Sequence, residues 1–266
     1  MSFATVRAGG LEFFRAAELQ VPNAFTTRRG GVSEGCLSEL NLGFHRGDRP
    51  RNVLENHRRL AAAVGYDVKR LVCTRQVHGD AVRVVTEADW GQGLFWPAPD
   101  CDGLVTQTPG TALAVFVADC TPVLLWDAAT GAVGAVHAGW RGTALGIAAR
   151  AVETMARAFG TRPQDVRAAI GPCVDRCCYE TGPDVPAAMA AALGPAARSA
   201  LDDLGGGRWR VDLKELNAVW LARAGVGEIV TAPWCTACQP ERFFSHRRMG
   251  EARGLQAAVI ACGPRR

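Results

Sequence analysis

Residues 118–143, ADCTPVLLWDAATGAVGAVHAGWRGT, decide the fold of this chain. They contain two short apolar runs, at residues 122–126 and 132–136, separated by a polar turn at residues 127–131. A third apolar run, ALAVFVA at residues 112–118, comes immediately before them. Short apolar runs bounded by turn residues are typical of buried strands. The stretch therefore predicts three buried strands in succession.

Cys120 and His137 lie directly beside the ends of these strands. A rigid scaffold presents side chains to a pocket at such positions. A thiol and an imidazole placed in this way can bind a metal ion, or they can act as a nucleophile and its base. The residue types alone leave both interpretations open.

Strand and helix patterns mix along the rest of the chain, which predicts an α/β (α+β) fold formed by a single domain over residues 1–266. No internal repeat, low-complexity tail or clear linker divides the sequence. Helical spacing of apolar residues predicts helices at residues 51–65, 143–159, 183–193 and 212–224. Strand patterns occupy residues 71–77, 82–85, 166–170, 229–230 and 257–261, with one or two more strands within residues 1–30.

Composition argues against several classes of protein. The chain has a formal net charge of only +4 and scattered arginines, so we expect no nucleic-acid partner. No apolar run is long enough to span a bilayer, and the N-terminus carries no secretory signal. We therefore expect a cytoplasmic protein without membrane contact, of undetermined oligomeric state. Ten cysteines in that compartment are expected to be buried thiols, ligands or nucleophiles rather than disulfides.

His78 lies at a predicted strand break and offers a further imidazole. His78, Cys120 and His137 form a ligand set suited to zinc, and three protein ligands leave the fourth tetrahedral position open for water. Zinc would lower the pKa of that water to about 7. The alternative is a Cys120 nucleophile activated by His137. An acid such as Asp119 or Asp102 would then orient the imidazole.

Cys235 and Cys238 form a CxxC pair, which can be part of a zinc site or a redox site. A complete structural zinc site needs two more ligands, and Cys173, Cys177 and Cys178 are the available candidates. Because a lone CxxC is a weak signal, buried thiols near a pocket are the favoured interpretation.

The histidines argue against a multicopper oxidase centre. Such a centre needs many histidines, usually as His-X-His pairs, whereas this chain has five histidines and no such pair. A single copper ion could occupy the site of His78, Cys120 and His137, since copper binds nitrogen and sulfur ligands more tightly than zinc does. It would support at most an oxidase side activity.

Arginines beside these motifs indicate an anionic substrate. Arg141 follows the predicted strand at residues 132–136, and Arg247 and Arg248 follow an aromatic pair. Arginine grips phosphate or carboxylate through two parallel hydrogen bonds. The helix expected to begin near residue 143 would add free N–H groups that favour an anion. A surface role for Arg247 and Arg248 is an equal alternative.

Taken together, these motifs resemble one family, long labelled multicopper polyphenol oxidase or laccase-domain proteins. Its members are described as purine nucleoside phosphorylases with adenosine deaminase activity, and some as peptidoglycan editing factors. The resemblance extends from about residue 23 to about residue 261. The matching segments are QVHG at 76–79, DGLVT at 102–106, ADCTPV at 118–123, HAGWRGT at 137–143, IGPC at 170–173, YE at 179–180 and FFSHRR at 243–248.

The resemblance implies an α/β sandwich of mixed sheets flanked by helices, related to a cysteine-hydrolase-like toxin domain. It also implies a zinc-dependent phosphorylase that takes adenosine, inosine or methylthioadenosine with phosphate and that deaminates adenosine. His78, Cys120 and His137 would be the metal ligands. Residues with catalytic roles would be Cys120, His137, His78, Asp119 and Arg141, and those that bind substrate would be Asn41, Arg28, Arg247 and Arg248.

Two other activities stay open under this resemblance. One is a Cys–His hydrolase that edits amino acids in UDP-muramyl precursors of peptidoglycan, and the other is copper-dependent polyphenol oxidation. One segment also departs from the family pattern, which usually continues with Thr-Gly-Arg after the double arginine. This chain reads EARGL at residues 251–255, so the arginine is displaced or lost and its role is in doubt.

Overall fold

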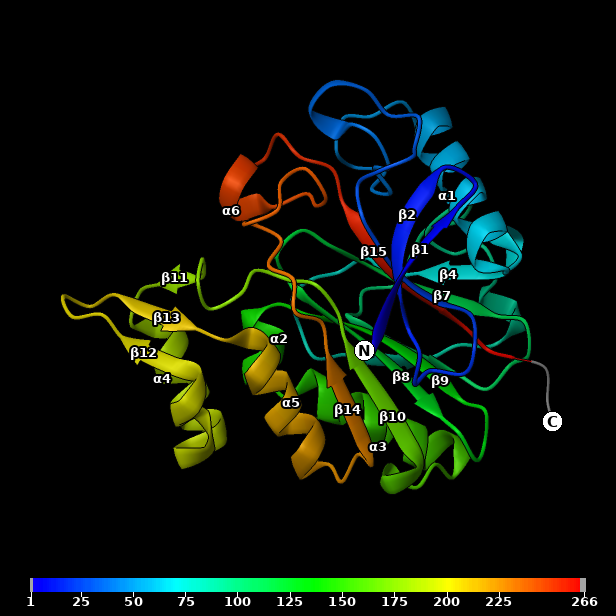
Figure 1. Cartoon of the computed structure of the whole chain (residues 1–266). Helices are drawn as coiled ribbons and strands as arrows, with labels where there is room; N and C mark the ends of the chain where they lie inside the picture. The colour runs from blue at the N-terminus through cyan, green and yellow to red at the C-terminus, as the bar shows by residue number, and fades with distance from the viewer. Residues whose placement is uncertain (1, 264–266) are drawn as a thin grey trace.

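The computed structural model describes residues 2–263, and two six-stranded mixed sheets form the centre of that part of the chain (Figure 1). The first sheet has the order β1 (Phe3–Ala8), β2 (Leu11–Ala16), β3 (Asn23–Thr26), β15 (Gln256–Ala261), β7 (Ala112–Val117) and β4 (Leu71–Cys73). The second has the order β14 (Glu228–Thr231), β10 (Val166–Ile170), β8 (Thr121–Asp127), β9 (Val133–Ala138), β6 (Gly103–Thr106) and β5 (Val82–Val84).

The two sheets pack against each other and share one apolar core. Phe14 and Leu113 of the first sheet belong to the same buried cluster as Leu104 and Leu124 of the second. Strands covered on both faces must be apolar throughout, which explains the uninterrupted run of β7. The prediction of an α/β sandwich with mixed sheets is confirmed.

Helices cover the outer faces of the sandwich (Figure 1). α1 (Pro50–Val64) packs Leu60 against the first sheet, where Phe13 and Val259 belong to the same buried cluster. α3 (Ile147–Phe159) and α5 (Leu213–Arg223) pack Val152 and Leu221 against the second sheet. The layers are therefore helix, sheet, sheet, helix.

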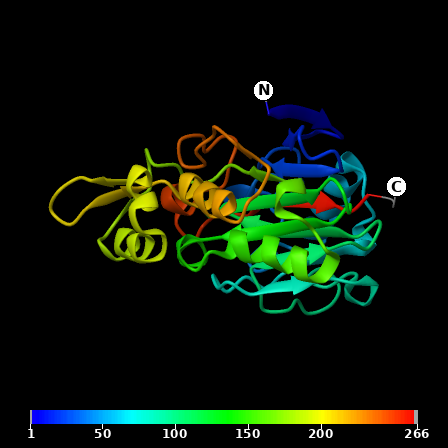
Figure 2. The same ribbon diagram turned by 90° about the horizontal axis from the view of Figure 1, so that it is seen from below.

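A small lobe extends from one side of the sandwich (yellow in Figures 1 and 2). Its apolar cluster reaches α5 through Leu213 and Leu216. The single domain predicted over residues 1–266 includes residues outside the described part and stays a prediction. The lobe contains β11 (Glu180–Thr181), β12 (Leu201–Asp203), β13 (Trp209–Val211) and α4 (Asp184–Leu193).

The structure corrects three predicted boundaries. The helix expected at 143–159 begins only at Ile147, because Gly146 adopts a left-handed φ of 75° and separates it from the short helix α2 (Trp140–Ala144). The free N–H groups expected near residue 143 therefore belong to α2, a single short turn. The strand expected at 71–77 ends at Cys73, and residues 1–30 form three strands rather than one or two. Within residues 2–263, no helix is long and apolar enough to cross a membrane.

Candidate active site

Three adjacent strands of the second sheet bring Asp102, Cys120 and His137 together. Asp102 directly precedes β6, Cys120 directly precedes β8, and His137 lies near the end of β9. β9 pairs with both β6 and β8, and the backbone N–H of His137 donates to the carbonyl oxygen of Asp102 at 2.7 Å. Strand pairing therefore gathers residues that are far apart in the sequence.

His78 joins them from the loop between β4 and β5. Its backbone is left-handed, with φ of 60°. The carboxylate of Asp102 accepts the backbone N–H groups of Val77, His78 and Gly79 at 3.2, 3.0 and 2.9 Å. β4 ends earlier, at Cys73, because the backbone N–H of Arg75 donates to Pro99 and the side chain of Gln76 occupies the backbone groups of Phe116 on β7. A buried carboxylate thus holds the loop that carries His78.

The donor atoms of His78, Cys120 and His137 all lie within 4.8 Å of one another. Cys120 Sγ is 3.8 Å from His78 Nε2, and the two imidazole rings are nearly perpendicular with centroids 4.8 Å apart. Zinc bonds of about 2.0–2.3 Å at tetrahedral angles place nitrogen and sulfur donors roughly 3.5 Å apart. The three residues therefore fit a divalent metal ion, and zinc and copper both accept this donor set.

Asp102 also orients the second imidazole, because its Oδ1 lies 2.8 Å from His137 Nδ1. This contact leaves Nε2 of His137 as the nitrogen that can bind a metal ion. A carboxylate behind a ligating histidine is usual in zinc sites, where it fixes the ring and strengthens the ligand. Of the two acids considered for this task, Asp102 performs it and Asp119 does not.

The cluster favours a thiolate. Burial opposes ionisation of Cys120, but the positive charge of His137 and hydrogen bonds from both histidines outweigh it and lower the pKa of Cys120 to about 6. Burial also opposes protonation of His137, yet the Cys120 thiolate and Asp102 raise the pKa of His137 to about 9. A metal ion and a cysteine nucleophile both need this deprotonated sulfur.

Gly139 is a glycine because it packs against the cluster. A Cβ atom at this position would lie 2.7 Å from Cδ2 of His78 and 3.4 Å from Sγ of Cys120. The first distance is shorter than real Cβ contacts allow. The close approach of this backbone therefore leaves no room for a side chain at residue 139.

Asp119 has a left-handed φ of 91° and a carboxylate occupied by local contacts. It accepts hydrogen bonds from the hydroxyls of Thr236 at 2.6 Å and Ser245 at 3.0 Å, and from the backbone N–H of Arg247 at 2.5 Å. These contacts tie the start of β8 to the chain segment before α6 (His246–Met249). Asp119 therefore positions the site in this structure, and its catalytic role stays a prediction.

Two predicted arginines surround Tyr179 next to the cluster. The guanidinium of Arg247 lies 5.4 Å from the centre of the Tyr179 ring, and that of Arg141 stacks on Trp140 at 4.3 Å. Burial and the negative charge of Cys120 raise the pKa of Tyr179 to about 12, against the opposing charges of Arg247 and Arg141. These charge interactions indicate that Cys120, Tyr179 and both arginines lie in one neighbourhood.

Arg253 lies in the departing segment and still reaches the site. Burial lowers its pKa, and its charge interacts with those of Asp119 and Cys120. Nε and Nη1 of Arg253 are buried without a hydrogen-bond partner among the described residues. The arginine is thus shifted along the sequence relative to the family pattern, but its side chain still lies near the site. The unusual EARGL segment was the signal for it, although sequence alone left its role in doubt.

Of three residues predicted to bind substrate, two have other contacts and one is exposed. Arg28 donates to the carbonyl oxygens of Ser38 at 2.6 Å and Pro240 at 3.0 Å. Asn41 is buried, and its Oδ1 accepts the backbone N–H of Leu255 at 3.0 Å, which holds the segment after Arg253. The side chain of Arg248 is exposed. The structure gives Arg28 and Asn41 supporting contacts, and a substrate-binding role for all three stays a prediction.

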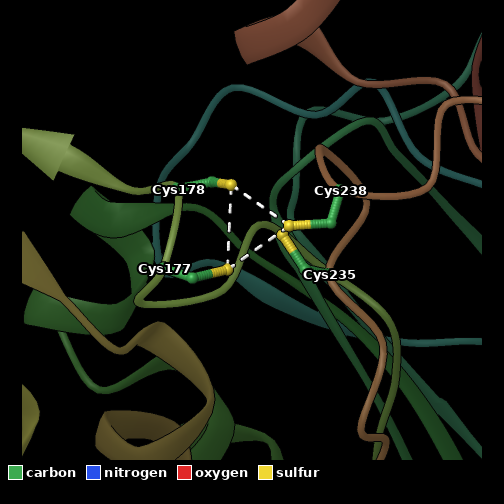
Figure 3. Close-up of side chains that lie close together, drawn as sticks. All are labelled: Cys177, Cys178, Cys235 and Cys238. Atoms are coloured by element: carbon green, nitrogen blue, oxygen red, sulfur yellow. Dashed lines mark hydrogen bonds between the residues drawn. The ribbon is translucent and has the colours of Figure 1, made fainter.

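A second cluster contains Cys177, Cys178, Cys235 and Cys238 (Figure 3). Cys173 and Cys235 form an isolated parallel bridge, which lays the two cysteine-bearing loops side by side. The favoured interpretation of these residues as buried thiols is wrong for Cys177 and Cys238, which are exposed. The sequence offers all four as ligands, but it does not show that these two loops lie side by side.

The sequence matches the family described as multi-copper polyphenol oxidoreductase laccase over residues 22–263. A purine nucleoside phosphorylase of Deinococcus radiodurans is 44% identical over 260 residues, covering 97% of this chain and 96% of that protein. The purine nucleoside phosphorylase YlmD of Geobacillus stearothermophilus is 38% identical over 240 residues, covering 88% of each. The crystal structure of YlmD from Geobacillus stearothermophilus matches 99% of both chains with a TM-score of 0.93 and 36% identity. The chain therefore belongs to the multi-copper polyphenol oxidoreductase laccase family.

Proposed function

We propose that this protein is a purine nucleoside phosphorylase with a zinc ion held by His78, Cys120 and His137. The names of its relatives support the reaction, and the donor set supports the metal. The observation that carries the proposal is the guanidinium of Arg253, because two of its nitrogens are buried without a hydrogen-bond partner among residues 2–263 and its charge interacts with those of Asp119 and Cys120. A buried charged donor of this kind suits an anion, and phosphate is the anion that a phosphorylase must bind.

In this proposal the arginines hold and orient phosphate for attack on the ribose. Arg253, Arg141 and Arg247 neutralise its charge and place one oxygen next to C1′. That oxygen forms the new bond to C1′ while the bond from C1′ to N9 breaks. The electron pair of the broken bond leaves with the purine. The purine takes up a proton, and ribose 1-phosphate is the second product. Tyr179, whose raised pKa keeps it a neutral phenol at pH 7, can donate a hydrogen bond to either partner.

Three side chains would hold the metal. His78, Cys120 and His137 would supply the donors, while Asp102 fixes the orientation of His137 and Gly139 permits their close packing. When bound, zinc would supply Lewis acidity and an open coordination position at neutral pH. A copper ion in the same donors would explain an oxidase side activity. A full multicopper centre does not fit a chain with five histidines and no His-X-His pair.

The proposed substrates are adenosine, inosine and methylthioadenosine, which share a purine and a ribose. We propose that the same site deaminates adenosine when water attacks C6 of the base and the amino group leaves as ammonia, which gives inosine. Purine nucleosides and phosphate are then the small-molecule partners. A cytoplasmic location and the lack of a nucleic-acid partner remain expectations from composition.

The test is product analysis with each nucleoside, with and without phosphate. Zinc-loaded protein should release the free base and ribose 1-phosphate only when phosphate is present, and should form inosine from adenosine in both conditions. Absence of phosphate-dependent base release from every nucleoside would contradict the phosphorylase.

Arg253→Met should raise the KM for phosphate by more than about tenfold, because a charged, bidentate contact is lost. The KM for inosine should change much less. Arg51→Met is the matched control, since Arg51 is an exposed residue of α1 far along the chain from the site. An unchanged phosphate KM in Arg253→Met would remove Arg253 from the phosphate site.

A second candidate is the hydrolase that edits UDP-muramyl precursors. It is favoured by one observation, the thiolate of Cys120 paired with His137 and Asp102, which is the arrangement of a cysteine nucleophile. In that reaction His78 has no required role and phosphate is not consumed. Amide cleavage that survives His78→Ala and ignores phosphate would support it over the phosphorylase.

A further inference from the structure

Four cysteines from two separate loops meet beside the lobe. Cys177 and Cys178 lie between β10 and β11, and Cys235 and Cys238 lie between β14 and α6. Sγ of Cys238 is 3.5 Å from that of Cys177 and 3.4 Å from that of Cys178, and the latter two are 3.7 Å apart (Figure 3). All four sulfur atoms lie within 4.8 Å of one another.

These separations match one kind of centre. Zinc–sulfur bonds of about 2.3 Å at tetrahedral angles place the sulfur atoms roughly 3.8 Å apart. A disulfide needs about 2.05 Å, so every measured pair is too far apart for one. Four sulfur atoms converging at this spacing from two loops therefore outline a tetrahedral coordination sphere.

The surroundings suit a negatively charged sulfur centre. The backbone N–H of Asp175 donates to Sγ of Cys235 at 3.3 Å, as amides do to metal-bound thiolates. Lys214 is almost fully buried, and its ammonium lies 3.0 Å from both Oδ2 of Asp175 and the carbonyl oxygen of Trp234. Lys214 thus ties together the two loops that carry the four cysteines.

We propose that Cys177, Cys178, Cys235 and Cys238 form a second metal site, which binds Zn²⁺ with four thiolates. The four thiols lose their protons and the ion binds the four sulfur atoms, which gives a centre of net charge −2. Soft thiolate ligands in a tetrahedral set select zinc. With four protein ligands no position is open to substrate, so this zinc is structural rather than catalytic.

Its position gives the second site a task in shaping the first. Cys178 is followed by Tyr179, whose ring lies under Arg247. Thr236, between the two cysteines of the CxxC pair, donates to Asp119 at 2.6 Å. A zinc ion that joins the two loops would therefore hold two walls of the active site in place.

The test measures zinc content by elemental analysis of purified full-length protein and needs no activity. Wild type should bind two zinc ions per chain, Cys238→Ser one, His78→Ala one and the double variant none. Cys36→Ser, which changes an exposed thiol outside both clusters, is the matched control and should bind two. Cys238→Ser with the zinc content of wild type would overturn the second site, whatever the fate of the proposed phosphorylase.

A measurement on wild type covers the case in which Cys238→Ser does not fold. Cys238 is exposed, so as a free thiol it would react readily with a thiol reagent. With zinc bound it should react only after a chelator is added, whereas Cys36 reacts throughout. Immediate reaction of Cys238 in zinc-loaded protein would contradict the site. A protein mass lower by two hydrogen atoms, restored by a reductant, would also contradict it, because it would show a disulfide.

Discussion

The two sulfur-containing clusters of this protein are built by opposite means. Cys120 and His137 lie at the ends of buried strands, and the buried carboxylate of Asp102 holds both His137 and the loop that carries His78. The four cysteines stand on two loops, and two of them are exposed. The first cluster has mixed donors and room for another ligand, whereas the second is closed and all sulfur.

The difference teaches how the fold separates reactivity from support. The ends of paired strands fix side chains to within about 0.5 Å, which an open and reactive metal site needs. Loops have no such rigidity of their own, so a four-thiolate ion would provide it. The first cluster is expected to perform the chemistry, and the second is expected to hold the loops that surround it.

The largest expected effect comes from removing a ligand of the open cluster. His78→Ala should lower phosphorolysis by more than about 100-fold, because loss of a ligand exceeds the usual cost of losing its supporting contact. It should also remove one zinc ion while leaving the four-cysteine site filled. The measurement is kcat for inosine together with zinc content. A variant that keeps both its full zinc and full activity would end this assignment of the ligands.

Asp102→Asn should have the next largest effect. It weakens the support of His137 and of the loop that carries His78, and an outer carboxylate of this kind contributes roughly 10–100-fold in metal affinity or activity. Zinc titration against a chelator would measure the affinity.

Asp100→Asn is the matched control for that variant. Asp100 lies two positions away, is exposed and forms an ion pair with Arg75. Its zinc affinity should equal that of wild type. Equal affinity in both variants would show that Asp102 does not support the metal.

The smallest expected effect is a difference in titration between the clusters of the metal-free, reduced protein. The pKa of Cys120 is lowered to about 6, so its alkylation should be half-maximal near pH 6 and fall at lower pH, where the thiol is protonated. Burial, together with Cys238 and Cys235, raises the pKa of Cys178 to about 11, so its alkylation should rise only in strongly alkaline solution. Peptide mapping after iodoacetamide treatment across pH would measure both midpoints.

The rate of Cys120 at pH 7 should stay close to that of an ordinary thiol, because a low pKa gives more thiolate but a weaker nucleophile. His137→Gln should move the midpoint of Cys120 toward the ordinary value, since the charge of His137 is the main cause of the low pKa. An unchanged midpoint in this variant would contradict the proposed pairing of Cys120 and His137.

Much of the strand pattern could be predicted from the sequence, because short segments of the chain carry it. The runs at residues 122–126 and 132–136 are apolar in every residue, since sheets or helices cover both of their faces and all of β8 and β9 is buried. Helix ends were less accessible: Gly146 interrupts a continuous apolar pattern because it adopts a backbone conformation that the spacing of its neighbours does not reveal.

The site was accessible only in part. The motifs named His78, Cys120 and His137, but the task of Asp102 depends on its contact with His137, 35 positions along the chain. Arg253 was set aside because its sequence context is unusual, and the fold returns its guanidinium to the neighbourhood of Cys120. Side-chain direction at the end of a long connection is decided by packing, not by the neighbouring residues.

The sequence by itself determined the strands, the class of the fold and the residue types able to bind a metal, because periodic burial and donor chemistry are properties of short segments. The tertiary structure decided which of these residues meet. Cys178 and Cys238 are 60 positions apart and come within 3.4 Å only because the loops around Cys173 and Cys235 run side by side. The pairing of distant segments follows from how the sheets close, and no short stretch of the chain carries that information.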